Sequence, residues 1–175
     1  MIVGRGPLSA AVIAVALLLQ VAVINRLPLP GGITPDVVLL AVAAVALVNG
    51  SMTGMVAGFF AGLAADIVPP ADHSVGRYAF ALCVVGFCCG RAEGVLQHSS
   101  LLPFGVLAGA ALGGSALYAG LGAFIGDPRV TWASVGHILP LSVVYALIAS
   151  PFVLYLVTRV FRRFDSEEPM LTVRL

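Results

Sequence analysis

The chain consists almost entirely of long apolar stretches that are separated by short polar breaks or by breaks rich in proline and glycine. About 20 apolar residues in a helix span the hydrocarbon core of a bilayer. A bilayer offers no water to exposed backbone groups, so such stretches cross it as helices. Charged residues make up only 10% of the chain, whereas soluble domains carry about 25%. The sequence therefore predicts an all-α, polytopic integral membrane protein.

The breaks divide this single predicted transmembrane domain, residues 1–175, into six transmembrane helices. Prolines and glycines at 28–32 end the first helix, because they disfavour a helix interior. Asn49-Gly50-Ser51 is a turn signal, and Pro69-Pro70 ends the third helix. The predicted helices cover about 8–24, 35–48, 52–68, 75–90, 101–125 and 135–161, and a short cytoplasmic tail covers 162–175. The second and third are short for a span, so either they thin the bilayer or one is partly re-entrant.

The distribution of arginine predicts the orientation of the chain. Cytoplasmic segments of membrane proteins carry an excess of basic residues. With both termini cytoplasmic, most of the arginines fall on the inner side. The inner segments then hold Arg5, Arg91, Arg159, Arg162, Arg163 and Arg174, and the outer loops hold Arg26, Arg77 and Arg129.

Several function classes lack support in the sequence. The net charge of +1 and the lack of a basic run argue against nucleic-acid binding. Cys88 and Cys89 are adjacent, with no histidine or acidic residue beside them, which argues against a metal site. We predict that Cys83, Cys88 and Cys89 are buried thiols acting as small hydrophobic residues. We predict no catalytic residue, no metal site and no cofactor, and the chain is not expected to be an enzyme.

Two glycine ladders with four-residue spacing give one smooth face to each of two predicted helices. Such a face lets another helix backbone approach closely, either within the bundle or from a partner. In a bundle of six helices we favour packing within the bundle, and one such arrangement has the two ladders packed around each other at its centre. The ladders are Gly54, Gly58 and Gly62 in the third helix, and Gly105, Gly109 and Gly113 in the fifth.

A group of polar residues is expected at the outer junction of the third and fourth helices. Asp66 lies near the outer end of the third helix, where a carboxylate needs water or a partner. Arg77 is its predicted partner across the loop that contains Asp72 and His73, and Gly76 precedes the fourth helix. The group is either a pocket or docking point on the outer face, or a clamp that fixes the hairpin. We favour the clamp, because charges near helix ends need not be functional.

The second helix is expected to begin at Pro35, a favoured residue in a first helical turn, with Thr34 as its N-cap. Asp36 would then lie in the first turn, where a negative charge suits the positive end of the helix dipole.

The order of these motifs resembles the rod shape-determining MreD family. The resemblance is carried by Pro35-Asp36-Val37-Val38-Leu39-Leu40, by Gly54-x3-Gly58-x3-Gly62-x3-Asp66 and by Gly76-Arg77-Tyr78-Ala79. The stretch from Pro69 to Tyr78 is similar to the actinobacterial form. The resemblance covers nearly the whole chain, although the fifth and sixth helices match only in hydrophobicity.

This resemblance implies a non-enzymatic scaffold in the bacterial inner membrane. MreD proteins associate with MreC, a bitopic membrane protein, and through it with the RodA glycosyltransferase and a class B penicillin-binding transpeptidase. The implied role is support of rod shape and of lateral peptidoglycan synthesis in the elongation complex. The implied fold is similar to the six-helix substrate-binding components of energy-coupling-factor transporters.

Two alternatives remain at this point. The fold analogy alone would allow a component of a membrane transporter that binds a vitamin-like small molecule. A weaker alternative is an enzyme acting on lipid-linked precursors at the outer face. Both would have to use the polar group of Asp66, Asp72, His73 and Arg77.

Overall fold

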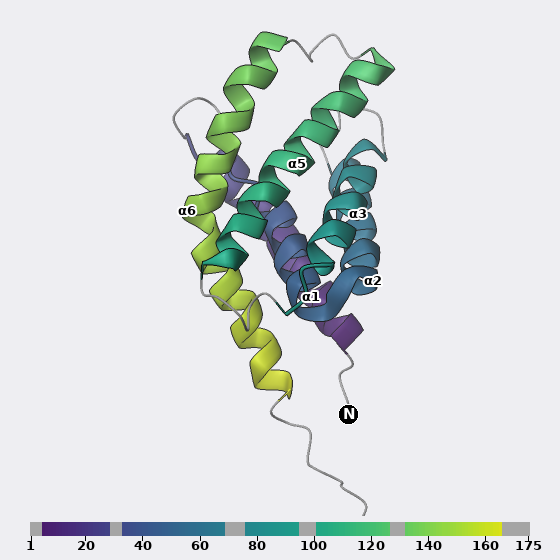
Figure 1. The fold of residues 1–175 in the computed structure, drawn as a ribbon, viewed down its shortest axis with the longest axis vertical. Helices are drawn as coiled ribbons and strands as arrows, with labels where there is room; N and C mark the ends of the chain where they lie inside the picture. Colours follow the sequence, from purple (N-terminus) through teal and green to yellow (C-terminus); the bar gives the residue numbers. More distant parts are fainter. Residues whose placement is uncertain (1–4, 29–32, 69–75, 95–100, 127–131, 166–175) are drawn as a thin grey trace, which may run out of the picture.

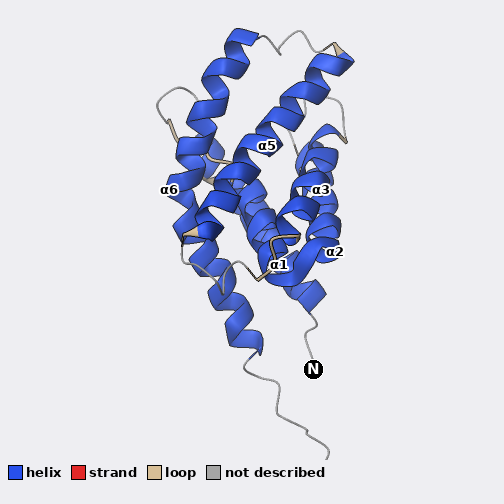
Figure 2. Ribbon diagram, in the orientation of Figure 1, coloured by secondary structure: helices blue, strands red, loops and turns tan. Residues whose placement is uncertain are grey.

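The computed structural model describes residues 5–28, 33–68, 76–94, 101–126 and 132–165. Helices are the only regular secondary structure among these residues (Figure 2), which confirms the predicted all-α class. The elements in chain order are α1 (Arg5–Ala22), a short 3-10 turn η1 (Ile24–Arg26), α2 (Val37–Ile67), α3 (Arg77–Gly90), α5 (Leu102–Ile125) and α6 (Trp132–Asp165).

Helix α2 turns back on itself at Gly50. The backbone of Gly50 is non-helical, with φ of 83° and ψ of 177°, a conformation open to glycine but strained for other residues. A Cβ atom at Gly54 would overlap the Cβ atom of Ala46, although eight residues span about 12 Å in a straight helix. Residues 37–49 and 51–67 therefore form a tight helical hairpin, with its turn where the Asn49-Gly50-Ser51 signal predicts it.

The first half of this hairpin is the centre of the bundle. Every residue from Val38 to Leu47 is at most 2% exposed, and α2 contacts α1, α3, α5 and α6. This explains why the segment has no polar face, since a helix enclosed on all sides is apolar all round.

The helical segments alternate in direction along the bundle (Figure 1). The start of α1, the turn at Gly50 and the end of α6 lie at one end of the molecule, at the bottom of the view. The two halves of α2, together with α1, α3, α5 and α6, make six helical segments within the described part of the chain.

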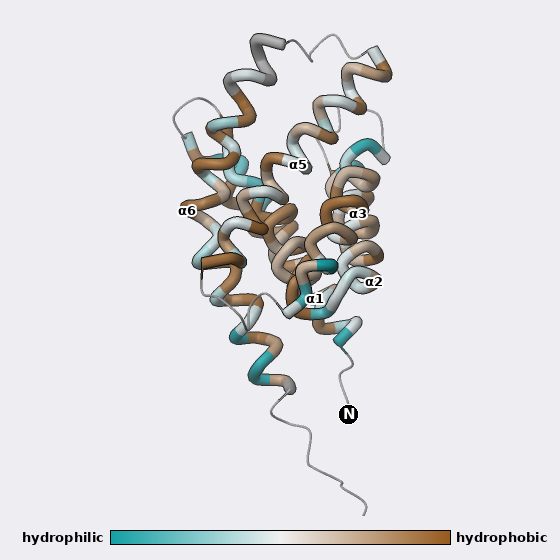
Figure 3. Tube along the Cα trace, in the orientation of Figure 1, coloured by the Kyte–Doolittle hydropathy of each residue, from teal (hydrophilic) through white to brown (hydrophobic). Residues whose placement is uncertain are grey.

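Among the described residues, four helices are long and apolar enough to cross a membrane: Arg5–Arg26, Val37–Ile67, Leu102–Ile125 and Ile138–Phe164. Helix α3 is apolar but shorter. Large hydrophobic side chains also lie on the outside, as with Phe124 at 91% and Phe152 at 76% exposure, and apolar residues extend over all the helices (Figure 3). Such a surface suits hydrocarbon rather than water, so the chain is a membrane protein.

Helix α6 departs from its predicted bounds at both ends. It begins at Trp132 and continues to Asp165. The prediction that the tail begins at residue 162 is therefore wrong, because residues 162–165 are still helical. Arg162 and Arg163 occupy the last helical turn, where positive charge stabilises the end of the helix dipole. Inside the helix, Pro151 cannot donate a hydrogen bond to the Leu147 carbonyl, and the Ser150 hydroxyl donates to that oxygen instead, at 2.9 Å.

Candidate functional site

The first glycine ladder is buried between the second half of α2 and α3. A Cβ atom at Gly58 would overlap the Leu82 carbonyl, and one at Gly62 would overlap the backbone of Ala79. A glycine of α3 is equally close to α2, because a Cβ atom at Gly86 would overlap the Gly54 carbonyl. These two helices touch backbone to backbone, so the ladder of Gly54, Gly58 and Gly62 serves packing within the bundle, as favoured from the sequence.

The second ladder does not pack within the described bundle. No described atom lies within 4 Å of the position of a Cβ atom at Gly105, Gly109 or Gly113, and the first two glycines are exposed. For this ladder the favoured prediction of packing within the bundle is therefore wrong, and the two ladders do not pack around each other in the described part of the chain.

The reason is that α5 turns a different face inward. A Cβ atom at Gly114 would collide with the Leu39 side chain of the central helix, and the neighbouring buried residues of α5 include Leu107 and Ala111. At 100° per residue these three positions lie nearly opposite Gly105 and Gly109. The stripe of Gly105, Gly109 and Gly113, here called the α5 glycine face, is therefore open to the surroundings.

The fully buried carboxylate of Asp66 caps the start of α3. Its Oδ2 atom accepts hydrogen bonds from the backbone amides of Gly76 at 2.7 Å, Tyr78 at 3.2 Å and Ala79 at 3.3 Å. Gly76 has a left-handed backbone with φ of 99°. A carboxylate is stabilised there because the first amides of a helix lack helical acceptors and carry partial positive charge. Asp66 thereby ties the end of the α2 hairpin to α3.

Arg77 connects the same junction to α5. Its side chain is 7% exposed, its Nε atom donates to the Tyr118 carbonyl at 2.9 Å, and its guanidinium lies 3.8 Å from the centre of the Tyr118 ring. Such a cation–π contact is stronger when it is removed from water. The predicted pairing of Arg77 with Asp66 stays a prediction, whereas the anchoring of Arg77 on α5 was not foreseen.

Asp36 begins α2 and joins the same network. It is the N-cap residue itself, accepting from the Leu39 amide at 2.9 Å, so the expectation that Thr34 caps the helix and that the helix begins at Pro35 is wrong. Aspartate competes well for this position because its short side chain reaches the amide three residues on. The Tyr78 hydroxyl donates to Asp36 Oδ2, and Gln20 of α1 accepts from the Val37 amide at 2.8 Å.

The polar junction, defined as Gln20, Asp36, Asp66, Arg77, Tyr78 and Tyr118, therefore links α1, both ends of the α2 hairpin, α3 and α5. The Tyr78 and Tyr118 rings also meet edge to face, with centroids 6.0 Å apart. The described hydrogen bonds of Asp36 and Asp66 go to helix starts and to a tyrosine. This arrangement favours the clamp interpretation over a ligand pocket.

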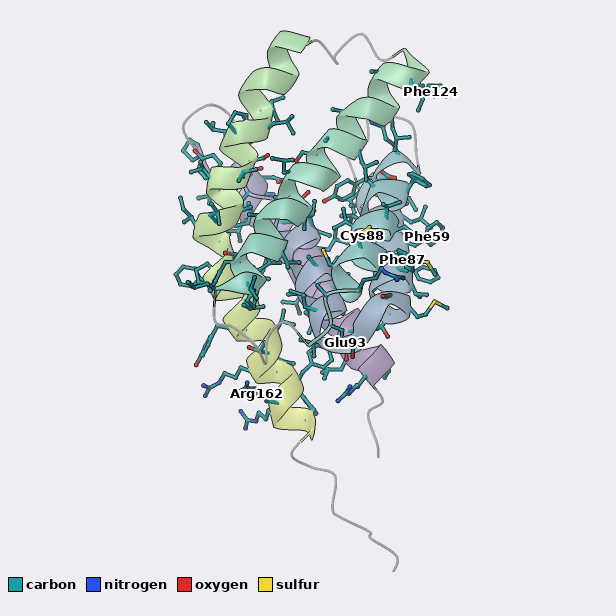
Figure 4. All side chains as sticks on the ribbon, in the orientation of Figure 1. Phe59, Phe87, Cys88, Glu93, Phe124 and Arg162 are labelled. Carbon is teal, nitrogen blue, oxygen red and sulfur yellow. The ribbon has the colours of Figure 1, made fainter. Side chains whose placement is uncertain are left out.

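The remaining predicted residues add little to this junction. Asp72 and His73 lie outside the described residues. Cys89 is buried, but Cys88 is exposed and Cys83 is half-buried, so the expectation of three buried thiols is wrong. Cys88 lies beside Phe87 on the outer side of α3 (Figure 4), because a 14-residue helix packed on one side leaves its other face outside.

Comparison with protein-family models, with curated proteins and with solved structures gave no match.

Proposed function

We propose that this chain is a non-enzymatic scaffold of the bacterial inner membrane, resembling MreD, that binds the single transmembrane helix of an MreC-like protein. The observation that carries the proposal is the open α5 glycine face. Helices in lipid associate through close backbone approach at small residues, because hydrocarbon provides no hydrophobic force between them. The same ladder motif in α2 accepts α3 in this way, so the α5 face is suited to a helix from outside the chain.

The positions of the residues that carry the family resemblance support the proposal. Asp36, Asp66 and Tyr78 come from three separate motifs, yet they meet in the polar junction. The glycine ladder between the first and last of these motifs packs α2 on α3. One structural unit, which joins the α2 hairpin to α3 and α3 to α5, would account for the order of these motifs.

The proposed topology has six membrane crossings, as in the substrate-binding components of energy-coupling-factor transporters. Two observations support it: the six helical segments alternate in direction, and α1 starts at the same end of the bundle at which α6 ends (Figure 1). We place both termini in the cytoplasm because the start of α1, which holds Arg5, and the end of α6, which holds Arg162 and Arg163, lie at the same end of the bundle (Figure 1), in agreement with the positive-inside rule. Each half of α2 is short for a span, and so is α3, so we propose that the bilayer is locally thinner around them.

The transporter alternative needs convergent polar groups around a small-molecule site. Among the described residues, the polar junction is the only convergent set of polar side chains that we identify. Its described hydrogen bonds join one helix to another or cap a helix start. We therefore prefer the scaffold, through which the chain would support RodA-type and transpeptidase activity indirectly.

We expect Gly109→Leu to leave the fold intact and to reduce recovery of the MreC-like protein about tenfold, or about 1.4 kcal/mol. No described atom lies within 4 Å of the position of a Cβ atom there, but the new side chain would hold an incoming helix away. The measurement is quantitative mass spectrometry of proteins that copurify with the tagged chain from its host in mild detergent.

Ala14→Leu is the matched control, because Ala14 is exposed on α1 and the change adds similar apolar bulk away from α5. Its recovery of the partner should equal that of the wild type. Equal recovery by Gly109→Leu, with an unchanged melting temperature, would refute the α5 face as the docking surface.

A further inference from the structure

The last turns of α6 present three arginines on the outside of the bundle. Arg159, Arg162 and Arg163 are exposed, whereas Val157 and Phe161 are 2% and 1% exposed and fix the opposite face in the core. Arg162 projects away from the bundle near the lower end of α6 (Figure 4). The core contacts thus set the rotation of the helix and direct the guanidinium groups outward.

Tyr155 holds the first of these arginines in place. The Arg159 Nη1 atom donates to the Tyr155 hydroxyl at 2.6 Å, and the guanidinium carbon lies 5.6 Å from the centre of the ring. Tyr155 itself is 61% exposed. Exposed tyrosines in membrane proteins concentrate where hydrocarbon meets the headgroups.

The surface next to these arginines is apolar. Phe152 and Leu156 are 76% and 53% exposed, and they suit contact with acyl chains. Arg159 lies less than one helical turn beyond Leu156, about 4.5 Å along the axis. Toward its lower end α6 thus changes from apolar to hydrophilic (Figure 3). Such a change suits a boundary between lipid tails and phosphates.

We infer that Tyr155, Arg159, Arg162 and Arg163, here called the α6 arginine site, bind the phosphate of an anionic phospholipid. Guanidinium groups make paired hydrogen bonds to phosphate oxygens, and the adjacent Phe152 and Leu156 would contact the acyl chains. Those apolar contacts argue for a lipid rather than free phosphate. Asp165, Glu167 and Glu168 follow in the sequence, so the site depends on placed guanidinium groups and not on net charge.

The test uses the full-length protein in zwitterionic detergent with equimolar dioleoylphosphatidylglycerol and dioleoylphosphatidylcholine. Native mass spectrometry measures how much of each lipid is retained. We expect preferential retention of phosphatidylglycerol. The triple variant Arg159→Gln, Arg162→Gln, Arg163→Gln should lose about tenfold or more of it, given the contribution of each basic residue near a lipid surface.

Arg26→Gln is the matched control, since Arg26 is exposed and follows α1 at the other end of the bundle. It should retain phosphatidylglycerol like the wild type. The proposal would be overturned if the wild type retained both lipids equally, or if Arg26→Gln lost as much phosphatidylglycerol as the triple variant. It would also be overturned if millimolar inorganic phosphate alone displaced the lipid. If the triple variant does not purify, the double variant Arg162→Gln, Arg163→Gln decides by the same criteria. This inference is independent of the proposed partner.

Discussion

Gly58→Leu is expected to destroy the packing of the α2 hairpin against α3. Its Cβ atom alone would overlap the carbonyl of Leu82, so the two backbones would have to separate along the whole ladder. Overpacking of a core costs about 1–3 kcal/mol even where side chains can adjust, and backbone atoms adjust less. We expect a loss of about 3 kcal/mol or more, measured by thermal unfolding in detergent and by the yield of monodisperse protein.

Gly109→Leu provides the matched comparison, because it makes the same change in the ladder of α5. No described atom lies within 4 Å of the position of its Cβ atom, so its melting temperature should stay close to that of the wild type. Similar melting temperatures for the two variants would contradict the assignment of one ladder to internal packing and the other to an open face.

Asp66→Ala is expected to have the second large effect, on the start of α3. The substitution removes the acceptor of three backbone amides, those of Gly76, Tyr78 and Ala79. Leaving a buried donor without a partner costs about 1–3 kcal/mol. We therefore expect a total loss of about 3 kcal/mol, with faster hydrogen exchange at these three amides.

Asp66→Asn should lie between the wild type and Asp66→Ala, since it keeps an acceptor oxygen and loses the charge that the helix start favours. Glu93→Ala is a control for removal of an acid at an exposed position, and it should change stability by no more than about 0.5 kcal/mol. Suppose that Asp66→Ala has the same melting temperature as Glu93→Ala and that the three amides still exchange slowly. That result would show that Asp66 does not cap α3.

The fold class and the main breaks were accessible from the sequence, because they depend on local chemistry. Proline and glycine interrupt helices wherever they occur, and Gly50 lies within a turn signal. The packing role of the first glycine ladder was also accessible, but the different role of the second was not. Both have the same spacing, and only the inward rotation of α5, set by residues such as Leu107 and Gly114, distinguishes them.

The polar junction was only partly predictable for a related reason. Asp66 was singled out because a carboxylate in an apolar helix needs compensation. Its described partners are backbone amides, which leave no mark in a residue pattern, so a charged side chain was expected instead. Tyr78 and Tyr118 were missed because a tyrosine in an apolar helix is usually a packing residue. The adjacency of Tyr78 to Arg77 was the available signal.

Photocrosslinking from the α5 glycine face tests the central claim most directly. Benzoylphenylalanine would replace Leu112, which is 51% exposed beside Gly109 and Gly113, and in a control it would replace Val56, 49% exposed on α2. After irradiation in the native host, mass spectrometry identifies the captured protein. We predict that position 112 captures a single-span MreC-like protein and that position 56 does not. Capture at position 112 of a transporter's coupling subunit, only of another copy of this chain, or of no protein would contradict the scaffold.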